Sequence, residues 1–308
     1  MESTKKDLST DGMGGGVPLH LRLRMALPTL RESERKVARA LLTRLDEVPR
    51  LGIVEAARVA GVSEASVMRL CRTLGFRGYT DFKVRLITDL AATDAQRHPV
   101  ALDDAGDDLQ PDDDIATVAR KVFHMDMQAL ADTLLVLDPH TIERAVEVIG
   151  GAARLEIFGL GGSSLIAQDA AYRFMRVGVA ATAPSDPDMQ AVRVALLTPH
   201  DAALAISHSG ETRDTIDTLA LAADAGVSTV AITGVPLSSL ARLADIALIT
   251  SSPDMRWHRE AISPRIVQLT LIDTICVALR LRKAPVAIDT LGKIENALKR
   301  KRVSEWPS

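Results

Sequence analysis

The chain has 308 residues, a net charge of −3, few aromatic residues and two cysteines. This length allows about two domains with a sizeable core. The first 16 residues lack the apolar core of a signal peptide, and no apolar run is long enough to cross a membrane, so we expect a soluble cytoplasmic protein. Cys71 and Cys276 lie in apolar helical patterns far apart, which predicts two buried free thiols.

Charge is unevenly distributed along the chain. Residues 19–85 hold 14 Lys and Arg against seven Asp and Glu, a local charge of +7 that leaves −10 for the remainder. A basic front part on an acidic chain indicates a nucleic-acid partner for that part alone. Residues 94–114 contain two prolines and a run of aspartates, which predicts a flexible linker. The expected division is a helical domain at 19–93, a linker at 94–114, a second domain at 115–290 and a tail at 291–308.

Helical periodicity dominates the front domain. Two helices are expected between residues 19 and 45, followed by helices at 53–60 and 64–74. The small residue Ala57, the turn glycine Gly61 and the apolar anchor Val67 have the spacing of a helix-turn-helix, and Ser63 is a good N-cap for its second helix. A helical hairpin inside an all-α domain is the alternative interpretation.

The second helix of this motif has two contrasting faces. Val67, Leu70, Cys71 and Leu74 share the face that we expect to be buried. The opposite face is predicted to carry Glu64, Ser66, Arg69, Arg72 and Thr73. In a DNA major groove, Arg69 is the candidate for a base contact and Arg72 for a backbone contact.

Residues 62–79, together with 33–38 and 81–83, closely resemble the N-terminal domain of RpiR-type bacterial transcriptional regulators. The resemblance implies double-stranded operator DNA as a partner. The candidate DNA-binding residues are then Ser63, Glu64, Ser66, Arg69, Arg72, Thr73 and Lys83.

Strands and helices alternate in the second half of the chain. Two helices are expected at 115–137 and 139–149. Five strands then follow at 155–160, 178–182, 202–206, 228–233 and 246–250, and the helices among and after them are expected at 165–177, 188–197, 212–225, 238–243 and 264–281. This alternation predicts a parallel sheet with helices on both faces. The expected fold class is therefore an all-α helix-turn-helix domain followed by an α/β domain.

A hydroxyl-rich turn joins the third strand to its helix. Its sequence is Ser207-His208-Ser209-Gly210-Glu211-Thr212. The free N–H groups and the dipole at a helix N-terminus favour an anion, three hydroxyls add donors, and glycine allows close backbone approach. A simple helix cap is the alternative. The turn resembles the phosphate loop of sugar isomerase (SIS) domains, which implies phosphosugar binding by Ser207, Ser209 and Thr212, with His208 assisting in positioning.

A glycine loop follows the first strand. It lacks the third glycine of a dinucleotide fingerprint, because Ser164 stands there, and no acidic residue ends the second strand. Gly159, Gly161 and Ser163 instead match the Gly-x-Gly-x-Ser loop of SIS domains. The resemblance therefore adds Gly161, Ser163 and Ser164 to the ligand site; for Ser163 a helix N-cap is the alternative. Residues 169–172, 185–190 and 265–269 match the SIS half of RpiR-type proteins as well.

Catalytic signatures are weak. Sugar isomerisation needs a base, and the candidates are His208, Glu211, His258 and Glu260; no Ser/His/Asp or metal-ligand pattern is present, and no cofactor is expected. The leading hypothesis is a DNA-binding transcriptional regulator, a homodimer or homotetramer, whose SIS domain senses a phosphosugar and modulates operator binding. An SIS-type isomerase or lyase is the first alternative, and a phosphosugar-dependent regulator that binds proteins is the second.

Overall fold

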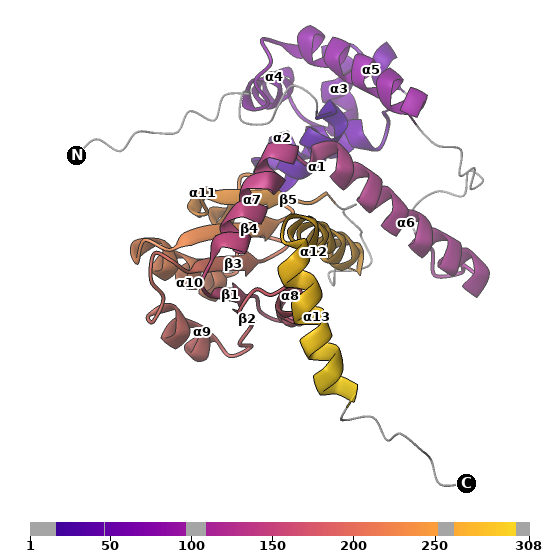
Figure 1. The fold of residues 1–308 in the computed structure, drawn as a ribbon. Helices are drawn as coiled ribbons and strands as arrows, with labels where there is room; N and C mark the ends of the chain where they lie inside the picture. Colours follow the sequence, from indigo (N-terminus) through magenta and orange to yellow (C-terminus); the bar gives the residue numbers. More distant parts are fainter. Residues whose placement is uncertain (1–16, 46, 97–108, 252–261, 300–308) are drawn as a thin grey trace. The chain divides into compact units, whose positions relative to one another are not determined.

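The structure is a computed structural model that describes residues 17–45, 47–96, 109–251 and 262–299 (Figure 1). Contacts divide the chain into two units. The first consists of Met1–Val136 with Ser251–Glu260, and the second of Leu137–Thr250 with Ala261–Ser308. Within the described residues, no helix is long and apolar enough to cross a membrane.

The first unit is helical throughout its described part. Its elements are α1 (Leu19–Ala26), η2 (Leu27–Thr29), α2 (Glu32–Leu42), η3 (Val48–Arg50), α3 (Ile53–Ala60), α4 (Glu64–Thr73), α5 (Tyr79–Gln96) and α6 (Ile115–Val136). Leu, Val and Ala side chains of α1 to α4 enclose one apolar core with Phe82 of α5. Phe76, between α4 and α5, meets Phe82 edge to face, and Tyr79 stacks on the same ring, so three aromatic rings pack together at the start of α5.

Helix α6 is grouped with the first unit by its contacts. The sequence alone predicts residues 115–136 in the sheet domain, because helical periodicity does not reveal which core a helix joins. In the structure the Asp132 carboxylate of α6 accepts a hydrogen bond from Arg24 Nη1 of α1 at 2.7 Å. This long-range ion pair joins two helices that the expected division had assigned to different domains.

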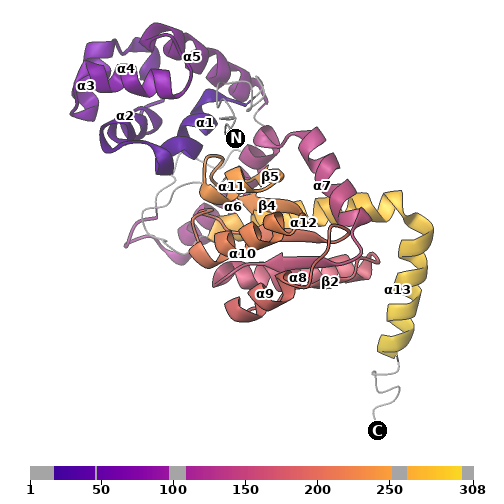
Figure 2. The same ribbon diagram turned by 90° about the vertical axis from the view of Figure 1, so that its left-hand side faces the viewer.

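The second unit is a parallel sheet between two helical layers. Its strands are β1 (Leu155–Phe158), β2 (Ala181–Thr182), β3 (Ala202–Ile206), β4 (Ser228–Thr233) and β5 (Ile246–Ile249), in the order β2-β1-β3-β4-β5. Its helices are α7 (Pro139–Gly151), α8 (Gly162–Arg176), α9 (Pro187–Val194), α10 (Arg213–Asp224), α11 (Ser239–Leu243), α12 (Ile262–Arg282) and α13 (Ala284–Lys299). The predicted fold class is confirmed. Helix α13, part of which was expected to be a tail, turns sharply from the end of α12 (Figure 2).

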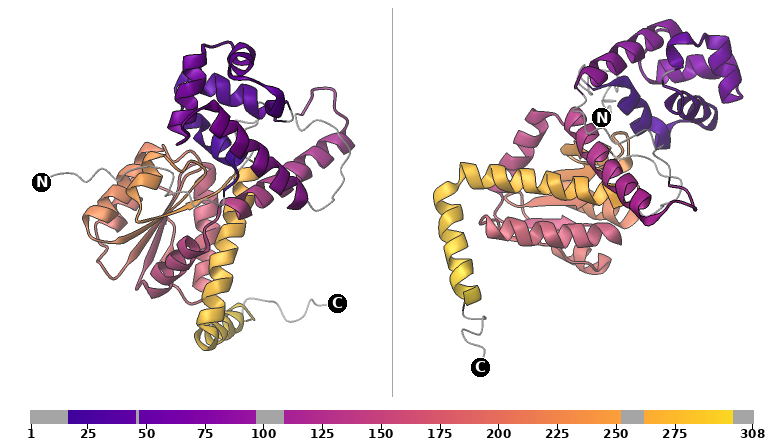
Figure 3. Two further views of the ribbon diagram at one scale, coloured as in Figure 1. Left: turned by 90° about the horizontal axis from the view of Figure 1, so that it is seen from above. Right: turned by 90° about the vertical axis from the view of Figure 1, so that its right-hand side faces the viewer.

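The two faces of the sheet differ in side-chain size. Helices cover both faces of the sheet (Figure 3). Leu204 and Ile206 of β3 pack with residues of α7, α8 and α12, whereas Ala203 and Ala205 pack with residues of α9, α10 and α11. This is the two-residue alternation of a strand, and both faces are buried because each bears helices. The small alanines leave room for α10 to pack closely.

Both cysteines are buried free thiols, as predicted. Burial raises the pKa of the Cys71 thiol to about 11 and that of the Cys276 thiol to about 12. Because the thiolate is the reactive form, both side chains act as small apolar groups of the core.

An ion pair at the amino-terminal edge of the sheet is expected to make stability depend on pH. The buried Asp201 carboxylate accepts from Arg154 at 2.7 Å and from the N–H and hydroxyl of Thr198. The hydrogen bonds from Arg154 lower the pKa of Asp201 from 3.8 to about 2. A lowered folded-state pKa contributes stability above pH 4 and loses it as the pH falls towards 2.

We therefore expect Asp201→Asn to lower the free energy of unfolding by about 1–2 kcal/mol at pH 7, a value reduced for the solvent exposure of Arg154. Urea unfolding at pH 7 and pH 2 measures this difference, which should shrink at the lower pH. Equal stability of the two proteins at pH 7 would contradict the assignment.

Candidate functional site

The turn after β3 is held in a tight conformation by its own hydroxyl groups. Ser207 is 4% exposed, and its N–H donates to the Ile232 carbonyl of β4 at 3.1 Å. Ser207 Oγ accepts from the Gly210 N–H at 3.2 Å and lies 3.1 Å from Thr212 Oγ1. Ser209 remains exposed, and its Oγ accepts from the Glu211 N–H at 3.2 Å. The structure thus brings the three predicted hydroxyls into one turn.

Gly210 is required by the geometry of this turn. Its φ is +64°, in the left-handed region, and a Cβ at this position would lie 2.1 Å from Ser238 Oγ. Its carbonyl accepts from the Leu240 N–H of α11 at 3.0 Å. The glycine therefore lets the turn pack directly against the start of α11.

Thr212 is the N-cap residue of α10, but its hydroxyl makes no capping hydrogen bond. It contacts Ser207 Oγ instead. The first N–H groups of a helix have no partner within the helix, so the start of α10 offers donors to an anion. The simple-cap interpretation of this hydroxyl is not what the structure shows.

Glu211 and His208 are held by neighbouring elements. The Glu211 carboxylate accepts from the Ser239 N–H and hydroxyl, each at 2.8 Å, and these bonds lower its pKa. The His208 ring packs on Gly234, where an added Cβ would lie 2.7 Å from Nδ1. Its carbonyl accepts from the Gly234 N–H at 2.9 Å. Both residues therefore support the position of the turn.

The glycine loop after β1 leads directly into α8. Gly161 has a φ of +56° and is the N-cap residue, so Ser163 is not the cap. A Cβ on Gly159 would lie 2.7 Å from the Ser163 carbonyl oxygen, which explains the need for glycine there. Ser164 Oγ donates to the Gly161 carbonyl at 2.7 Å. The helix starts earlier than the expected residue 165, because the left-handed glycine turns the chain at once.

The two loops leave the same edge of the sheet. Strands β1 and β3 are parallel neighbours, with Phe158 paired to Ala205. Helix α8 packs on one face and α10 on the other. The gap between β1 and β3 is therefore a topological switch point, where ligands of open α/β sheets bind. We retain Gly161, Ser163, Ser164, Ser207, His208, Ser209 and Thr212 as the predicted ligand site.

The helix-turn-helix consists of α3 and α4. Gly61 ends α3 with a φ of +63°, Ala57 is 4% exposed, and Val67 is fully buried. The predicted apolar face of α4 is buried as a whole. This arrangement leaves Glu64, Arg69, Arg72 and Thr73 exposed.

Side chains of α4 form two hydrogen bonds to α2 and one within α4. Arg69 Nη2 donates to Ser66 Oγ at 2.9 Å and to Ser33 Oγ at 3.2 Å, and Thr73 Oγ1 donates to a Glu34 carboxylate oxygen at 3.2 Å. Arg69 therefore reaches solvent with its guanidinium oriented by two hydroxyls. Because the Arg69 side chain is already oriented, it would lose less conformational entropy on contacting DNA.

Three of the predicted DNA-binding residues have other contacts. Ser66 is 4% exposed, so its predicted place on the exposed face is wrong; it lies beside the buried Val67 and accepts from Arg69. Lys83 is half-buried, and its Nζ donates to the carbonyls of Leu51 and Pro49. Ser63 is the N-cap residue, but its Oγ lies 3.2 Å from Ser66 Oγ and makes no capping bond.

Both parts of the chain match known families. Residues 18–93 match the helix-turn-helix domain of the rpiR family, and residues 149–278 match the SIS domain. An uncharacterized HTH-type transcriptional regulator of Haemophilus influenzae is 31% identical over 275 residues, which are 89% of this chain and 94% of that protein. The chain belongs to the RpiR-type transcriptional regulators.

Solved structures agree with this RpiR-type assignment. The NanR protein of Vibrio vulnificus, complexed with ManNAc-6P, is 25% identical and covers 92% of this chain and 100% of its own, with a TM-score of 0.58. The sugar isomerase domain of an RpiR transcription factor from Sphaerobacter thermophilus is 27% identical and covers 58% of this chain and 98% of its own, with a TM-score of 0.55.

Gln190 of this RpiR-type chain has a role that the sequence analysis missed. Its side chain is fully buried on α9, and Nε2 donates to the Pro184 carbonyl at 2.9 Å and to the Gly159 carbonyl at 3.4 Å. One amide thus joins the loop after β2 to the glycine loop. The family resemblance of residues 185–190 was the only signal that could have indicated it.

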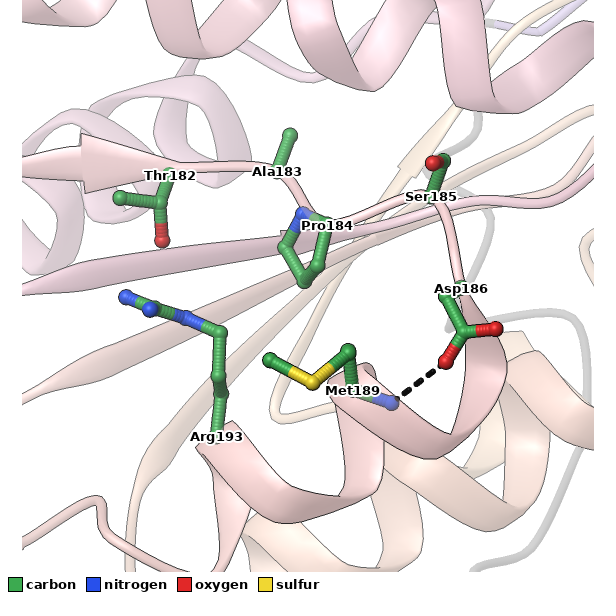
Figure 4. Close-up of a pocket in the computed structure, with 7 residues that line it drawn as sticks. All are labelled: Thr182, Ala183, Pro184, Ser185, Asp186, Met189 and Arg193. Carbon is green, nitrogen blue, oxygen red and sulfur yellow. Dashed lines mark hydrogen bonds between the residues drawn. The ribbon is translucent and has the colours of Figure 1, made fainter.

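A cavity of about 400 Å³ lies beside this loop, between the end of β2 and α9 (Figure 4). It is lined by Thr182, Ala183, Pro184, Ser185, Asp186, Met189 and Arg193. Arg193 and Thr182 both bind the buried Glu156 carboxylate, and Asp186 caps α9 through the Met189 N–H. Three of its four polar side chains, Thr182, Asp186 and Arg193, therefore already form structural hydrogen bonds.

Proposed function

We propose that this RpiR-type regulator binds a phosphorylated sugar, or a related phosphorylated metabolite, at the switch point and changes its operator affinity in response. The observation that carries the proposal is the turn after β3. Ser207, Ser209 and Thr212 gather their hydroxyls around the left-handed Gly210 at the start of α10. Neutral donors at a helix N-terminus suit a phosphate group without any cation.

Related structures support the class of effector. The NanR protein of Vibrio vulnificus, similar over nearly the whole chain, was solved with ManNAc-6P. A hexosamine 6-phosphate is therefore a sensible member of any panel of candidate effectors. A phosphate bound at the turn would leave the sugar to contact the glycine loop with Gly161 and Ser163.

Operator DNA is the proposed partner of the helix-turn-helix. Residues 19–85 carry a charge of +7, and α4 presents Arg69 and Arg72 on its exposed face. Such a surface suits phosphates and base edges of the major groove. We propose a homodimer or homotetramer in the cytoplasm, which would bind a palindromic operator if its helix-turn-helix units are related by a two-fold axis.

Catalysis is not part of the proposal. A sugar isomerase needs a base that is free to move a proton between adjacent carbons. Both oxygens of Glu211 are occupied by Ser239, and the lowered pKa makes this carboxylate a weaker base. His258 and Glu260 lie outside the described residues.

The test is retention of the upstream DNA of its own gene by the purified protein at about 150 mM salt, where non-specific binding is weak. Glucose 6-phosphate, fructose 6-phosphate, ribose 5-phosphate and N-acetylmannosamine 6-phosphate are added one at a time. A specific complex whose affinity changes with one compound is the expected result. Consumption of a compound without any specific DNA complex would favour the enzyme.

A further inference from the structure

Two neighbouring residues of α6 are buried polar groups with partners far away in the sequence. Thr133 is 4% exposed; its Oγ1 donates to the Ser251 carbonyl at 3.0 Å and accepts from the Ser251 N–H at 2.9 Å. One hydroxyl thus satisfies both backbone groups of Ser251. We call this pair of hydrogen bonds the Thr133 clasp.

Asp132 connects the same turn of α6 to α1. It is 2% exposed and accepts from Arg24 Nη1 at 2.7 Å and from Gln128 Nε2 at 2.6 Å. A buried carboxylate needs such partners, because leaving it unpaired is strongly unfavourable. Since α1 contributes Leu19 and Leu23 to the core around α4, α6 is bonded to the body that carries the recognition helix.

From Ser251 a series of hydrogen bonds leads back to the turn after β3. The preceding residue, Thr250, donates its N–H to the Thr233 carbonyl at 2.9 Å. Thr233 Oγ1 in turn donates to the His208 carbonyl at 3.2 Å. Every step from His208 to Ser251 is therefore either a covalent bond or a hydrogen bond of this chain.

The end of β5 also holds two hydroxyls whose bonding is incomplete. Thr250 and Ser251 are each 1% exposed, and their Oγ atoms have no hydrogen-bond partner among the described residues. Buried hydroxyls without partners are unfavourable, so this arrangement of the strand end is raised in free energy. A small shift that gives these hydroxyls partners would be favourable, and it would displace the Ser251 backbone that Thr133 holds. Transmission through the clasp requires that its hydrogen bonds be made in one state and broken in the other, as coupling between distant sites demands.

We propose that the Thr133 clasp, with the Asp132–Arg24 ion pair beside it, transmits occupancy of the phosphate turn to the DNA-binding helices. This proposal rests on the proposed function, since it concerns how binding at the phosphate turn affects DNA binding. An effector at the phosphate turn changes operator affinity only to the extent that it binds the two states of the strand end with different affinities. Thr133 and Asp132 are positioning residues and contact neither effector nor DNA.

The decisive variant is Thr133→Val, which keeps the branched shape and removes the hydroxyl. Thr218→Val is the matched control, because Thr218 is also 4% exposed on a helix, and among the described residues its hydroxyl bonds only to Asp214 of the same helix. Each protein is titrated with operator DNA with and without the compound that acts on the wild type. Calorimetry gives the affinity for that compound, again with and without DNA.

We expect the wild type and Thr218→Val to show a response of roughly tenfold in operator affinity, within the usual range for coupled sites. In Thr133→Val the affinity for operator DNA alone and the affinity for the compound alone should each stay within about threefold of the wild type. The change in operator affinity caused by the compound, and the change in compound affinity caused by DNA, should both fall below about twofold. A full response in Thr133→Val overturns the proposal.

A second variant keeps the proposal testable if Thr133→Val does not fold. Asp132→Asn preserves the shape of the side chain but removes the charge that pairs with Arg24, and it too should reduce the response. A full response in a folded Asp132→Asn overturns the role of the ion pair and, with it, the transmission through α6. If the wild type itself responds to no compound, the sensor function has failed, which the wild-type titration shows before any variant is measured.

Discussion

Replacing Ser207 and Ser209 together by alanine is expected to lower the affinity for the active phosphosugar by at least about 100-fold, because each hydrogen bond to a charged group contributes about 1.5–3 kcal/mol. Operator affinity without effector should be unchanged, since the turn lies in the second unit. Calorimetric titration measures the first quantity and fluorescence anisotropy with labelled operator the second.

The two serines differ in structural role, so the single variants are informative. Ser207 is buried and supports Gly210, whereas Ser209 is exposed and accepts only from the Glu211 N–H among the bonds described. Ser209→Ala alone should therefore weaken binding without loss of thermal stability. Ser228→Ala is the control, because Ser228 is the first residue of β4 and lies at the amino-terminal ends of the strands, away from the turn after β3. Undiminished phosphosugar affinity in the double variant would remove the turn from the site.

Replacing Arg69 by alanine is expected to weaken specific operator binding by about 1–3 kcal/mol, or roughly 5- to 150-fold, if Arg69 contacts a base. The guanidinium is already oriented by Ser33 and Ser66, so the wild type loses little side-chain freedom on binding. Discrimination between bases at one position of the operator should fall as well. Anisotropy titrations against the operator and single-base variants measure both effects.

Arg72→Ala should behave differently, because a phosphate contact carries no sequence information. We expect weaker binding to all sequences and a salt dependence whose logarithmic slope is smaller by about 1. Arg280→Ala, which removes an exposed arginine of α12, is the matched control and should leave binding unchanged. An Arg69→Ala protein with wild-type operator affinity would exclude Arg69 from the DNA interface.

Much of the fold follows from local patterns. The helix-turn-helix was predicted in register from Ala57, Gly61 and Val67. Ala57 is the small residue at the helix contact, Gly61 is the left-handed turn residue and Val67 is the buried anchor, and all three lie within a short stretch of sequence. The α3 helix and the β4 strand were predicted with their observed ends. The start of α8 was misplaced, since a single φ angle at Gly161 decides where that helix begins.

The sequence did not reveal that Ser66 and Lys83, both predicted to bind DNA, are buried or half-buried. Periodicity placed Ser66 opposite the apolar stripe of α4, yet Ser66 is buried and its hydroxyl lies within hydrogen-bond distance of Ser63 and Arg69. Lys83 likewise donates to carbonyls more than 30 residues away. The position of a second helix against the first is a property of packing. No spacing within one helix encodes it.

The sequence by itself determined the two kinds of domain, the turn that suits a phosphate and the membership of a family of transcriptional regulators. These depend on local periodicity, on glycines with positive φ and on a run of hydroxyls, all of which are short-range properties. Only the tertiary structure decided that Gln190 joins two loops and that Asp132 and Thr133 bind Arg24 and Ser251. Hydrogen bonds between separate elements and loops depend on how those parts of the chain pack, and a linear pattern of residues does not specify that packing.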